Sequence, residues 1–334
     1  MKALALHSGG LDSTLAIKII LDQGLEIEAV NFISPFYQRR ARNNSAENEA
    51  KKTADNLGVN LKTINLGKEC LDIIRNPKHG YGKNLNPCID CRILMNRRAK
   101  EYMQESGTSF IITGEVVGQR PMSQHKNALR LIDKESGLKG LVLRPLSARV
   151  LPLTIPEERQ WVRRDRLLAI SGRSRKPQIT LARHYHIADY PAPAGGCLLT
   201  DPGFSRRLKD LLDHHSFNLE EIELLKIGRH FRLSASAKLV VGRNQQENLL
   251  INSLASPGEL HFCPARDKGP EALARGKFSA LDIKNACRII ARYCDNNNRR
   301  RKIKISLARY ARWQEKQVIQ ARPISERALR DLRI

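Results

Sequence analysis

The first residues that could do chemistry form the string S-G-G-L-D-S at positions 8–13. Its two glycines let the backbone come close to an anion, and the free N–H groups of a helix starting there point at that anion. Ser8 and Ser13 can add hydroxyl donors. Asp12 cannot attract a phosphate by its own charge, which favours a role in holding a divalent metal ion that bridges phosphates. The string therefore predicts a phosphate-binding turn, although a generic glycine turn between a strand and a helix has the same outline.

Three cysteines form a second group with chemical potential. Cys88 and Cys91 are spaced C-x-x-C just before an expected helix, whose N-terminus favours thiolates. Cys197 follows a Gly-Gly turn more than a hundred residues later. Such a set could hold an iron–sulfur cluster with one open iron, or a zinc ion if His184 or His186 supplied a fourth ligand. A thioredoxin-like redox pair would need only the first two cysteines, and the third could also be no more than a small residue in a tight turn.

Alternating strands and helices must position these groups. The expected strands cover residues 4–6, 25–32, 61–66, 110–115 and 141–146, and the expected helices cover residues 11–23, 45–57, 92–105 and 156–170. This alternation predicts a doubly wound parallel α/β sheet, whose ligands bind at the carboxyl ends of the strands. Asn31 and Phe32 would then lie beside the first turn, where an adenine ring could rest. The basic, aromatic loop 36–42 would lie at the same edge, where it could contact RNA or simply be solvated.

The character of the sequence changes after about residue 215. Short strands are expected at residues 224–228, 237–241 and 259–263, and a helix is expected at residues 280–292. This mixture predicts a smaller α+β domain. The expected division is therefore a first domain at residues 1–215, a second at 216–310, and a basic tail at 311–334.

Charge is distributed unevenly over the 334 residues, a length that suits about two domains. The net charge of +24 is too large for an ordinary metabolic enzyme and predicts a polyanionic partner. Residues 1–60 carry seven basic and seven acidic side chains, whereas residues 288–334 carry fourteen basic and four acidic ones. The C-terminal part, above all residues 299–330, is therefore expected to bind phosphates or to form a solvated helix face.

The N-terminus runs directly into a strand, and no apolar run is long enough to span a bilayer. We therefore expect a cytoplasmic protein without membrane contact, whose seven cysteines stay reduced. Four of these cysteines stand singly in apolar or helical contexts and are expected to be inert core thiols: Cys70, Cys263, Cys287 and Cys294.

The string at positions 8–13 resembles the pyrophosphatase loop, or PP-loop, of ATP pyrophosphatases, which cleave ATP to AMP and pyrophosphate while adenylating a substrate. It is not a Walker A loop, because the G-K-[ST] ending is absent. Together with the cysteine pattern and the string T-G-E-V-V-G-Q-R-P-M-S-Q at residues 113–124, it makes about residues 1–205 similar to the tRNA 4-thiouridine synthetase family. The resemblance implies an adenine nucleotide alpha-hydrolase-like fold, and three cysteines resemble the branch that carries a 4Fe–4S cluster.

The implied activity is ATP-dependent tRNA thiolation, in which a uridine carbonyl is adenylated and its oxygen is replaced by sulfur, giving 4-thiouridine. The implied cofactors are ATP, Mg²⁺ and a 4Fe–4S cluster, with zinc as the second choice. The implied catalytic residues are Asp12, Cys88, Cys91 and Cys197, of which the three cysteines would also be the metal ligands. The implied ATP-binding residues are Ser8, Gly9, Gly10, Asp12, Ser13, Asn31, Phe32, Gly114 and Gln119. Arg120, next to Gln119, could contact phosphate or the target base.

The second domain resembles the NFACT-R (DUF814) RNA-binding module of ribosome quality-control factors. The resemblance covers about residues 224–305 and rests on L-V-V-G-R-N-Q-Q-E-N at 239–248 and H-F-C-P-A-R-D at 261–267. It implies contact with tRNA, in agreement with the charge distribution. The chain departs from the 4-thiouridine family, since no RNA-binding domain precedes the PP-loop and no rhodanese-like domain is present. Sulfur is therefore expected from free sulfide or from a separate donor protein.

Three alternatives stay open. The product could be 2-thiouridine, although the bacterial 2-thiouridylases usually have Asp-x-x-Cys where this chain has Cys88-x-x-Cys91. The enzyme could be an amidotransferase or a lysidine-type ligase, which would not need three cysteines. The chain could also be a non-catalytic RNA-binding factor in translation quality control, against which the intact PP-loop argues. The oligomeric state is likewise open, with a homodimer as one option.

Overall fold

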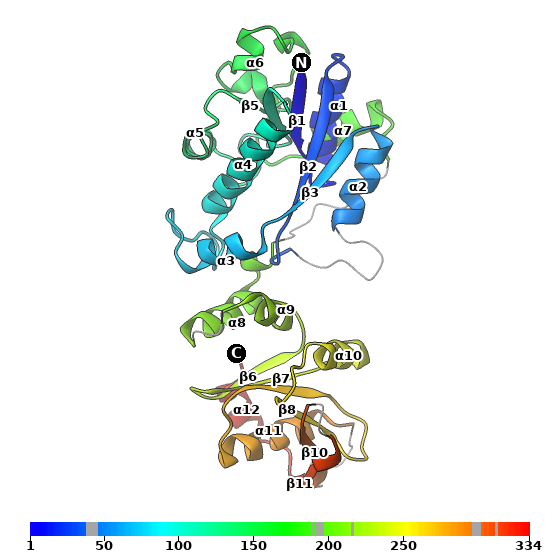
Figure 1. Cartoon of the computed structure of the whole chain (residues 1–334), viewed down its shortest axis with the longest axis vertical. Helices are drawn as coiled ribbons and strands as arrows, with labels where there is room; N and C mark the ends of the chain where they lie inside the picture. Colours follow the sequence, from blue (N-terminus) through cyan, green and yellow to red (C-terminus); the bar gives the residue numbers. More distant parts are fainter. Residues whose placement is uncertain (38–45, 189, 191–196, 215–216, 296–301, 311–312) are drawn as a thin grey trace. The chain divides into compact units, whose positions relative to one another are not determined.

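The computed structural model describes residues 1–37, 46–188, 190, 197–214, 217–295, 302–310 and 313–334. These residues form two compact units, Met1–Thr200 and Asp201–Ile334 (Figure 1). The boundary lies nearer the N-terminus than residue 215, because helix α8 (Pro202–Asp213) packs with the second unit. No described helix is long and apolar enough to cross a membrane.

The first unit is built on a parallel sheet with strand order β3-β2-β1-β4-β5. Its strands are β1 (Lys2–Leu6), β2 (Glu26–Ile33), β3 (Asn60–Asn65), β4 (Phe110–Thr113) and β5 (Val142–Leu143). Strands covered on both faces need apolar side chains throughout, and β1 and β4 are almost wholly buried. The doubly wound parallel sheet expected from the sequence is therefore confirmed.

Helices cover both faces of this sheet. They are α1 (Leu11–Leu21), α2 (Ala46–Asn56), α3 (Gly67–Arg75), α4 (Cys88–Glu105), α5 (Lys126–Glu135), α6 (Ile155–Glu158) and α7 (Lys176–His184), with 3₁₀ turns at Ala148–Val150, Arg164–Arg166 and Leu198–Thr200. Figure 1 shows α1, α2 and α7 on one side and α4 and α5 on the other.

The long helix expected at residues 156–170 is wrong. Thr154 and Glu157 form a capping box that starts a helix, but α6 lasts for a single turn. Gln160 then adopts a left-handed backbone conformation with φ 57°, which turns the chain away. Only the short 3₁₀ turn at Arg164–Arg166 follows before α7.

Strand register brings three loops to one edge of the sheet. Leu6, at the end of β1, pairs with Val30 of β2 on one side and with Thr113 of β4 on the other. The chain order reverses between β1 and β4, which makes this edge the topological switch point where parallel sheets bind ligands. The loops that follow β1, β2 and β4 therefore surround the position expected for a nucleotide.

The second unit contains an antiparallel sheet with strand order β11-β10-β8-β9-β7-β6. Its strands are β6 (Arg229–Ser234), β7 (Ala237–Val241), β8 (Leu260–Pro264), β9 (Ala272–Gly276), β10 (Ile303–Arg309) and β11 (Gln317–Ala321). Its helices are α8, α9 (Leu219–Leu225), α10 (Gln245–Ser253), α11 (Ala280–Tyr293) and α12 (Glu326–Leu332), with a 3₁₀ turn at Trp313–Glu315. The expected α+β character is confirmed.

Two expectations for this unit differ from the structure. Residues 224–228 were expected as a strand, but Asn218 caps a helix there by accepting a hydrogen bond from Glu221 N–H, so α9 runs to Leu225. Residues 311–334 were expected as a tail, yet β11 pairs with β10, and Leu329 of α12 is buried in the core. The C-terminal segment is therefore part of the second unit.

Candidate active site

The loop after β1 makes a tight turn into α1. Gly9 has φ +71°, and a Cβ placed on it would lie 2.7 Å from Ala50 N, so the position requires glycine. Ser8 N–H donates to Ser13 Oγ at 3.3 Å, and Ser13 Oγ donates to the Gly10 carbonyl at 2.9 Å. These bonds hold the turn closed at the N-terminal end of α1, the arrangement that suits an anion.

Gly114 follows β4 and packs directly against the start of α1. A Cβ there would lie 2.4 Å from Ser13 N and 2.5 Å from the Asp12 carbonyl carbon. No side chain fits in that space without moving backbone. The close approach of the two loops explains why glycine stands after this strand.

Asp12 is held by residues that come from two distant loops. Gln119 Nε2 donates to Asp12 Oδ2 at 2.8 Å, and Gln178 Nε2 donates to Gln119 Oε1 at 3.1 Å. The Arg175 guanidinium lies 3.9 Å from Asp12 Oδ1, which accepts no hydrogen bond within the described chain. A carboxylate oxygen without a hydrogen bond and a nearby guanidinium are the group types that accept a metal ion and a phosphate, respectively.

Arg175 and Gln178 were missed by the sequence analysis. They lie at and just after a basic loop at residues 172–177, which offers no motif of its own. The loop reaches Asp12 because Val117 forms a bridge with Ser171, and Gly172 N–H donates to the Val117 carbonyl at 2.7 Å. Only this long-range contact gives the loop a place in the site.

Asn31 and Phe32, expected near an adenine ring, lie at the end of β2. Asn31 Nδ2 donates to the His7 carbonyl at 2.7 Å, which ties β2 to the first loop. Phe32 is largely buried. His7 itself is buried, and burial lowers the pKa of its imidazole to about 4, so the ring is neutral at pH 7.

The two cysteines of the C-x-x-C lie inside α4, not before it. Cys88 is the first residue of the helix, and Cys91 N–H donates to the Pro87 carbonyl at 3.0 Å, which closes the first turn. Both thiols are free and half-buried. They therefore occupy the helix end where the backbone dipole favours negative charge.

Cys197 is brought to the same neighbourhood by the chain that follows β2. It forms a bridge with Tyr37, Leu198 N–H donates to the Phe36 carbonyl at 2.9 Å, and the Cys197 Sγ lies 4.0 Å from Asn86 Oδ1. Asn86 stands two residues before Cys88. The structure thus places all three expected cysteines close together.

The pKa values of Cys91 and Cys197 are shifted by burial and by the neighbouring cysteines. Burial raises the pKa of Cys91, and negative charge on Cys70, Cys197 and Cys88 raises it further. Burial also raises the pKa of Cys197, Cys88 acts in the same direction, and the positive charge of Arg120 opposes the rise. Cys91 and Cys197 are therefore protonated at neutral pH unless a metal ion displaces the proton.

A buried ion network lies beside this cysteine turn. Arg144 donates to Glu115 at 3.0 Å and to both carboxylate oxygens of Asp133 at 2.8 and 2.9 Å. Arg92, the residue after Cys91, lies 3.8 Å from Glu115. Burial works against the charge on Glu115, but the two arginines outweigh it and hold the pKa of that carboxyl below its ordinary value. The network joins the loop after β4 to the first turn of α4.

Among the described residues, no group of three or more His, Cys, Asp and Glu side chains lies close enough together to hold a metal ion. His184 and His186, the alternatives for a fourth zinc ligand, are exposed at the end of α7 and just after it. The donor chemistry nevertheless fits a 4Fe–4S cluster, because three neighbouring free thiols can bind three irons and leave one open.

Some expected site residues lie outside the described part of the chain. They include the two glycines before Cys197, residues 195 and 196, and residues 38–42 of the basic loop. The arginines at 299–301, expected to bind phosphates, also lie outside it.

Two family models match this chain in separate segments. Residues 1–149 match the model described as "Thiamine biosynthesis protein (ThiI)". Residues 228–333 match the model described as "NFACT protein RNA binding domain". The second match spans the antiparallel sheet and reaches through α12, as the structure would require.

Curated relatives resemble the chain at low identity. A "tRNA-specific 2-thiouridylase MnmA" of Marinobacter nauticus is 26% identical over 75% of this chain and 63% of its own length. A "Probable tRNA sulfurtransferase" of Ureaplasma parvum serovar 3 is 32% identical over 44% of this chain and 37% of its own. The chain thus spans less than two thirds of either relative.

Solved structures with a similar chain path include two tRNA-related proteins. One is a 4-thiouridine synthetase in complex with RNA and bound ATP. The matched region is 23% identical in sequence, covers 67% of this chain and 52% of the synthetase chain, and has a TM-score of 0.41. The other is the U34-tRNA thiolase NcsA of Methanococcus maripaludis with its [4Fe-4S] cluster. The matched region is 16% identical, covers 68% of this chain and 73% of the NcsA chain, and has a TM-score of 0.35. From the two family models, we conclude that this chain combines a segment similar to the ThiI model with a segment similar to the NFACT RNA-binding model.

Proposed function

We propose that the chain catalyses ATP-dependent thiolation of tRNA, with 4-thiouridine as the product. One observation carries the proposal. Two adjacent residues of the loop after β4 interact with the turn at residues 8–13 and with one of the cysteines. Gln119 donates to Asp12 at 2.8 Å, and the charge of the next residue, Arg120, acts on Cys197. An adenylated nucleotide formed at the turn would therefore lie within reach of sulfur presented by the cysteines.

The chain's own residues support the two chemical steps. Ser8, Ser13 and the glycine turn would bind the ATP phosphates, and Asp12 would hold Mg²⁺. The uridine carbonyl oxygen attacks the α-phosphate, and pyrophosphate leaves with the electron pair of the broken P–O bond. Hydrosulfide then attacks the ring carbon, and the adenylated oxygen departs as AMP. Adenylation is needed because a uracil oxygen is otherwise a poor leaving group.

The three cysteines would act as metal ligands in this scheme. The raised pKa values of Cys91 and Cys197 disfavour free thiolates at these two residues, whereas metal binding drives thiol deprotonation. A 4Fe–4S cluster held by Cys88, Cys91 and Cys197 would supply an open iron that binds sulfide. Without a cluster, a separate donor protein would transfer its persulfide sulfur to Cys197. The outer sulfur would attack the ring carbon as AMP leaves, and the Cys88 or Cys91 thiol would then attack Cys197 Sγ, forming a disulfide and leaving the sulfur on the base.

The proposal is tested by nucleoside mass spectrometry. Anaerobically reconstituted full-length protein is incubated with unmodified tRNA, ATP, Mg²⁺ and sulfide, and the digested RNA is searched for thionucleosides. We expect 4-thiouridine; 2-thiouridine would instead support the reaction named for the 26%-identical relative. AMP formation without any thionucleoside would contradict the proposal and indicate another adenylated substrate, such as that of a lysidine-type ligase.

Single cysteine substitutions should show which thiols are needed for thiolation and which only fill the core. We expect Cys88→Ala, Cys91→Ala and Cys197→Ala each to abolish thiolation and to weaken the iron–sulfur absorbance of the reconstituted protein. Cys287→Ala is the matched control, because Cys287 is a free thiol buried in the hydrophobic core of the second unit. Full activity in all three site variants would contradict a role for these residues.

A further inference from the structure

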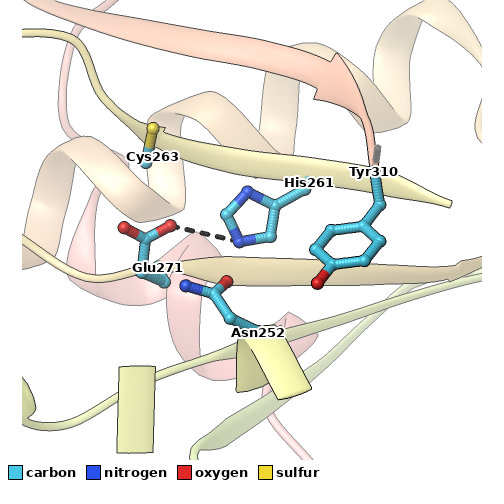
Figure 2. A pocket seen from close by; sticks show the side chains of 5 residues that line it. All are labelled: Asn252, His261, Cys263, Glu271 and Tyr310. Atoms are coloured by element: carbon cyan, nitrogen blue, oxygen red, sulfur yellow. Dashed lines mark ion pairs between the residues drawn. The ribbon is translucent and has the colours of Figure 1, made fainter. Parts of the chain in front are cut away.

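The second unit contains a pocket that the proposed thiolation does not use. The pocket measures about 450 Å³ and is open to solvent, and it is lined by Asn252, His261, Cys263, Glu271 and Tyr310 (Figure 2). Asn252 comes from α10, and His261 and Cys263 come from β8, whereas Glu271 lies just before β9 and Tyr310 just after β10. The volume is sufficient for a nucleobase with its ribose and falls in the range of small-molecule sites.

The pocket lies where α10 stops covering the sheet. α10 packs through Ile251 against Val240 and Leu273 of the central strands and ends at Ser253. On β8, His261 and Cys263 point to the same face, while Phe262 between them points into the core under α11. The sheet therefore forms the floor of the pocket and the end of α10 forms a wall.

Hydrogen bonds hold the lining residues in place. Glu271 N–H donates to Asn248 Oδ1 of α10 at 3.2 Å, which fixes the segment before β9 against the helix. Tyr310 N–H donates to the Glu259 carbonyl at 2.7 Å, which fixes the chain after β10. The pocket is thus a built feature of this unit and not a chance gap between side chains.

The side chains around the pocket match the surface of a nucleobase. His261 Nε2 lies 3.1 Å from Glu271 Oε2, and the His261 and Tyr310 ring centroids lie 6.4 Å apart at 61°. Figure 2 shows the Glu271 carboxylate and the Tyr310 ring on either side of the His261 ring. Asn252 Oδ1 is buried and accepts no hydrogen bond from the described chain. The His261 ring is buried and orients Glu271, so the Tyr310 ring is the one that can stack on a base, while an amide and a carboxylate can read the polar edge of a base.

The same face of the sheet carries lysines next to the pocket. Lys304 is exposed on β10, two residues from Ser306, the partner of Cys263 across the sheet. Val318 and Gln320, opposite on β11, are exposed as well, so no described element covers this part of the sheet. Exposed Lys316 is near enough for its charge to act on Cys263. A strand lying across this face would find cations for its phosphates beside a pocket for a base.

We propose that this pocket binds one unstacked nucleobase of a single-stranded RNA segment, with Lys304 and Lys316 on the adjoining phosphates. The inference rests on the tRNA partner of the proposed function and on the match of this unit to the NFACT RNA-binding model, and it does not depend on thiolation. An open sheet face that combines rings, polar edge-reading groups and lysines binds unpaired bases, because a base inside a duplex cannot enter such a pocket.

Two pocket variants and one matched control test the proposal. Asn252→Ala removes the amide from the pocket, and Glu271→Gln replaces the carboxylate acceptor with a neutral amide. Ser253→Ala changes the exposed neighbour of Asn252 on the same helix, whose hydroxyl donates to the Leu250 carbonyl. Fluorescence anisotropy of the full chain is measured with unstructured 12-nucleotide RNAs, with duplex RNA of equal length, and with free nucleoside monophosphates. Circular dichroism checks that each variant folds.

We expect both pocket variants to bind single-stranded RNA about tenfold more weakly, and duplex RNA and the Ser253→Ala protein to be unaffected. Free monophosphates should bind more weakly than the oligonucleotides, because they lack the neighbouring phosphates. Equal binding by wild type and both variants would overturn the proposal, as would an equal loss for duplex and single strand. Thiolation by the same proteins is measured in parallel, so that the two proposals can fail separately. If the wild type thiolates tRNA but the pocket variants bind RNA as it does, only the proposed base pocket is overturned. If the pocket variants lose RNA binding but the wild type does not thiolate tRNA, only the proposed enzyme activity is overturned.

Discussion

Gly114 is the residue where the phosphate-binding turn leaves least room. A methyl group there would lie 2.4 Å from Ser13 N, within the first turn of α1, so Gly114→Ala must displace backbone. We expect a loss of about 1–3 kcal/mol in stability and a loss of ATP binding, measured by thermal unfolding and by isothermal titration calorimetry with ATP. Gly10→Ala is the control for stability, since its Cβ would meet only Ser8 Oγ, at 3.4 Å. A Gly114→Ala protein with wild-type stability would contradict the close contact.

His7 makes the stability of the first unit depend on pH. Its pKa is about 4 when folded and about 6.5 when unfolded, so the unfolded chain binds more protons between these values. Protonation of His7 therefore favours the unfolded chain. The free energy of unfolding falls as the pH drops from about 6.5 toward 4, by at most about 3 kcal/mol. His7→Leu should flatten this part of the profile in urea unfolding, whereas His184→Gln, at an exposed histidine, should not. Identical profiles for wild type and His7→Leu would contradict the assignment.

Among the elements, the C-terminal helix α12 packs into the core of the second unit, so the basic end of the chain contributes to its fold. Leu329 of α12 is 4% exposed in the core of the second unit, whereas Leu281 of α11 is 64% exposed. We expect Leu329→Ala to lower the free energy of unfolding by about 2–5 kcal/mol and Leu281→Ala to leave it nearly unchanged. Chemical denaturation followed by circular dichroism measures both. Equal stability of the two variants would mean that α12 does not pack on this core.

The elements that were expected correctly are those with strong local signals. Continuous apolar runs gave β1, β2 and β4, and regular apolar spacing gave α1 and α11. The errors arose where one residue overrode the pattern: Gln160, with its positive φ, ended α6, and Asn218 capped α9 where a strand was expected. Such events depend on backbone geometry that residue types alone do not specify.

For the whole molecule, the charge of +24 predicts strong dependence of RNA affinity on salt. Each phosphate contact releases counterions, so the logarithm of the affinity should fall linearly with the logarithm of the salt concentration. We expect Lys304→Ala to reduce the slope by about one, and Lys51→Ala, an exposed lysine of the first unit that pairs with Asp55, to leave it unchanged. Anisotropy titrations of tRNA between low and moderate salt measure the slopes. A slope near zero for the wild type would contradict an electrostatic RNA interface.

The sequence by itself determined the parts of this protein that depend on neighbours along the chain. The string at positions 8–13 predicts a tight anion-binding turn, because a strand, two glycines and a helix start are local properties. The C-x-x-C spacing indicated that the Cys88 and Cys91 thiols can converge on one centre, and the charge count indicated a polyanionic partner. These inferences need no knowledge of what lies opposite in space.

Only the tertiary structure decided which distant residues meet. It placed Cys197 beside Asn86, and Arg175 beside Asp12, through contacts across more than a hundred residues of sequence. It also assembled the pocket of Figure 2 from four segments that are separate in the sequence. The physical reason is that strand order and register set these distances, and both follow from how the whole core packs, not from any single stretch of the chain.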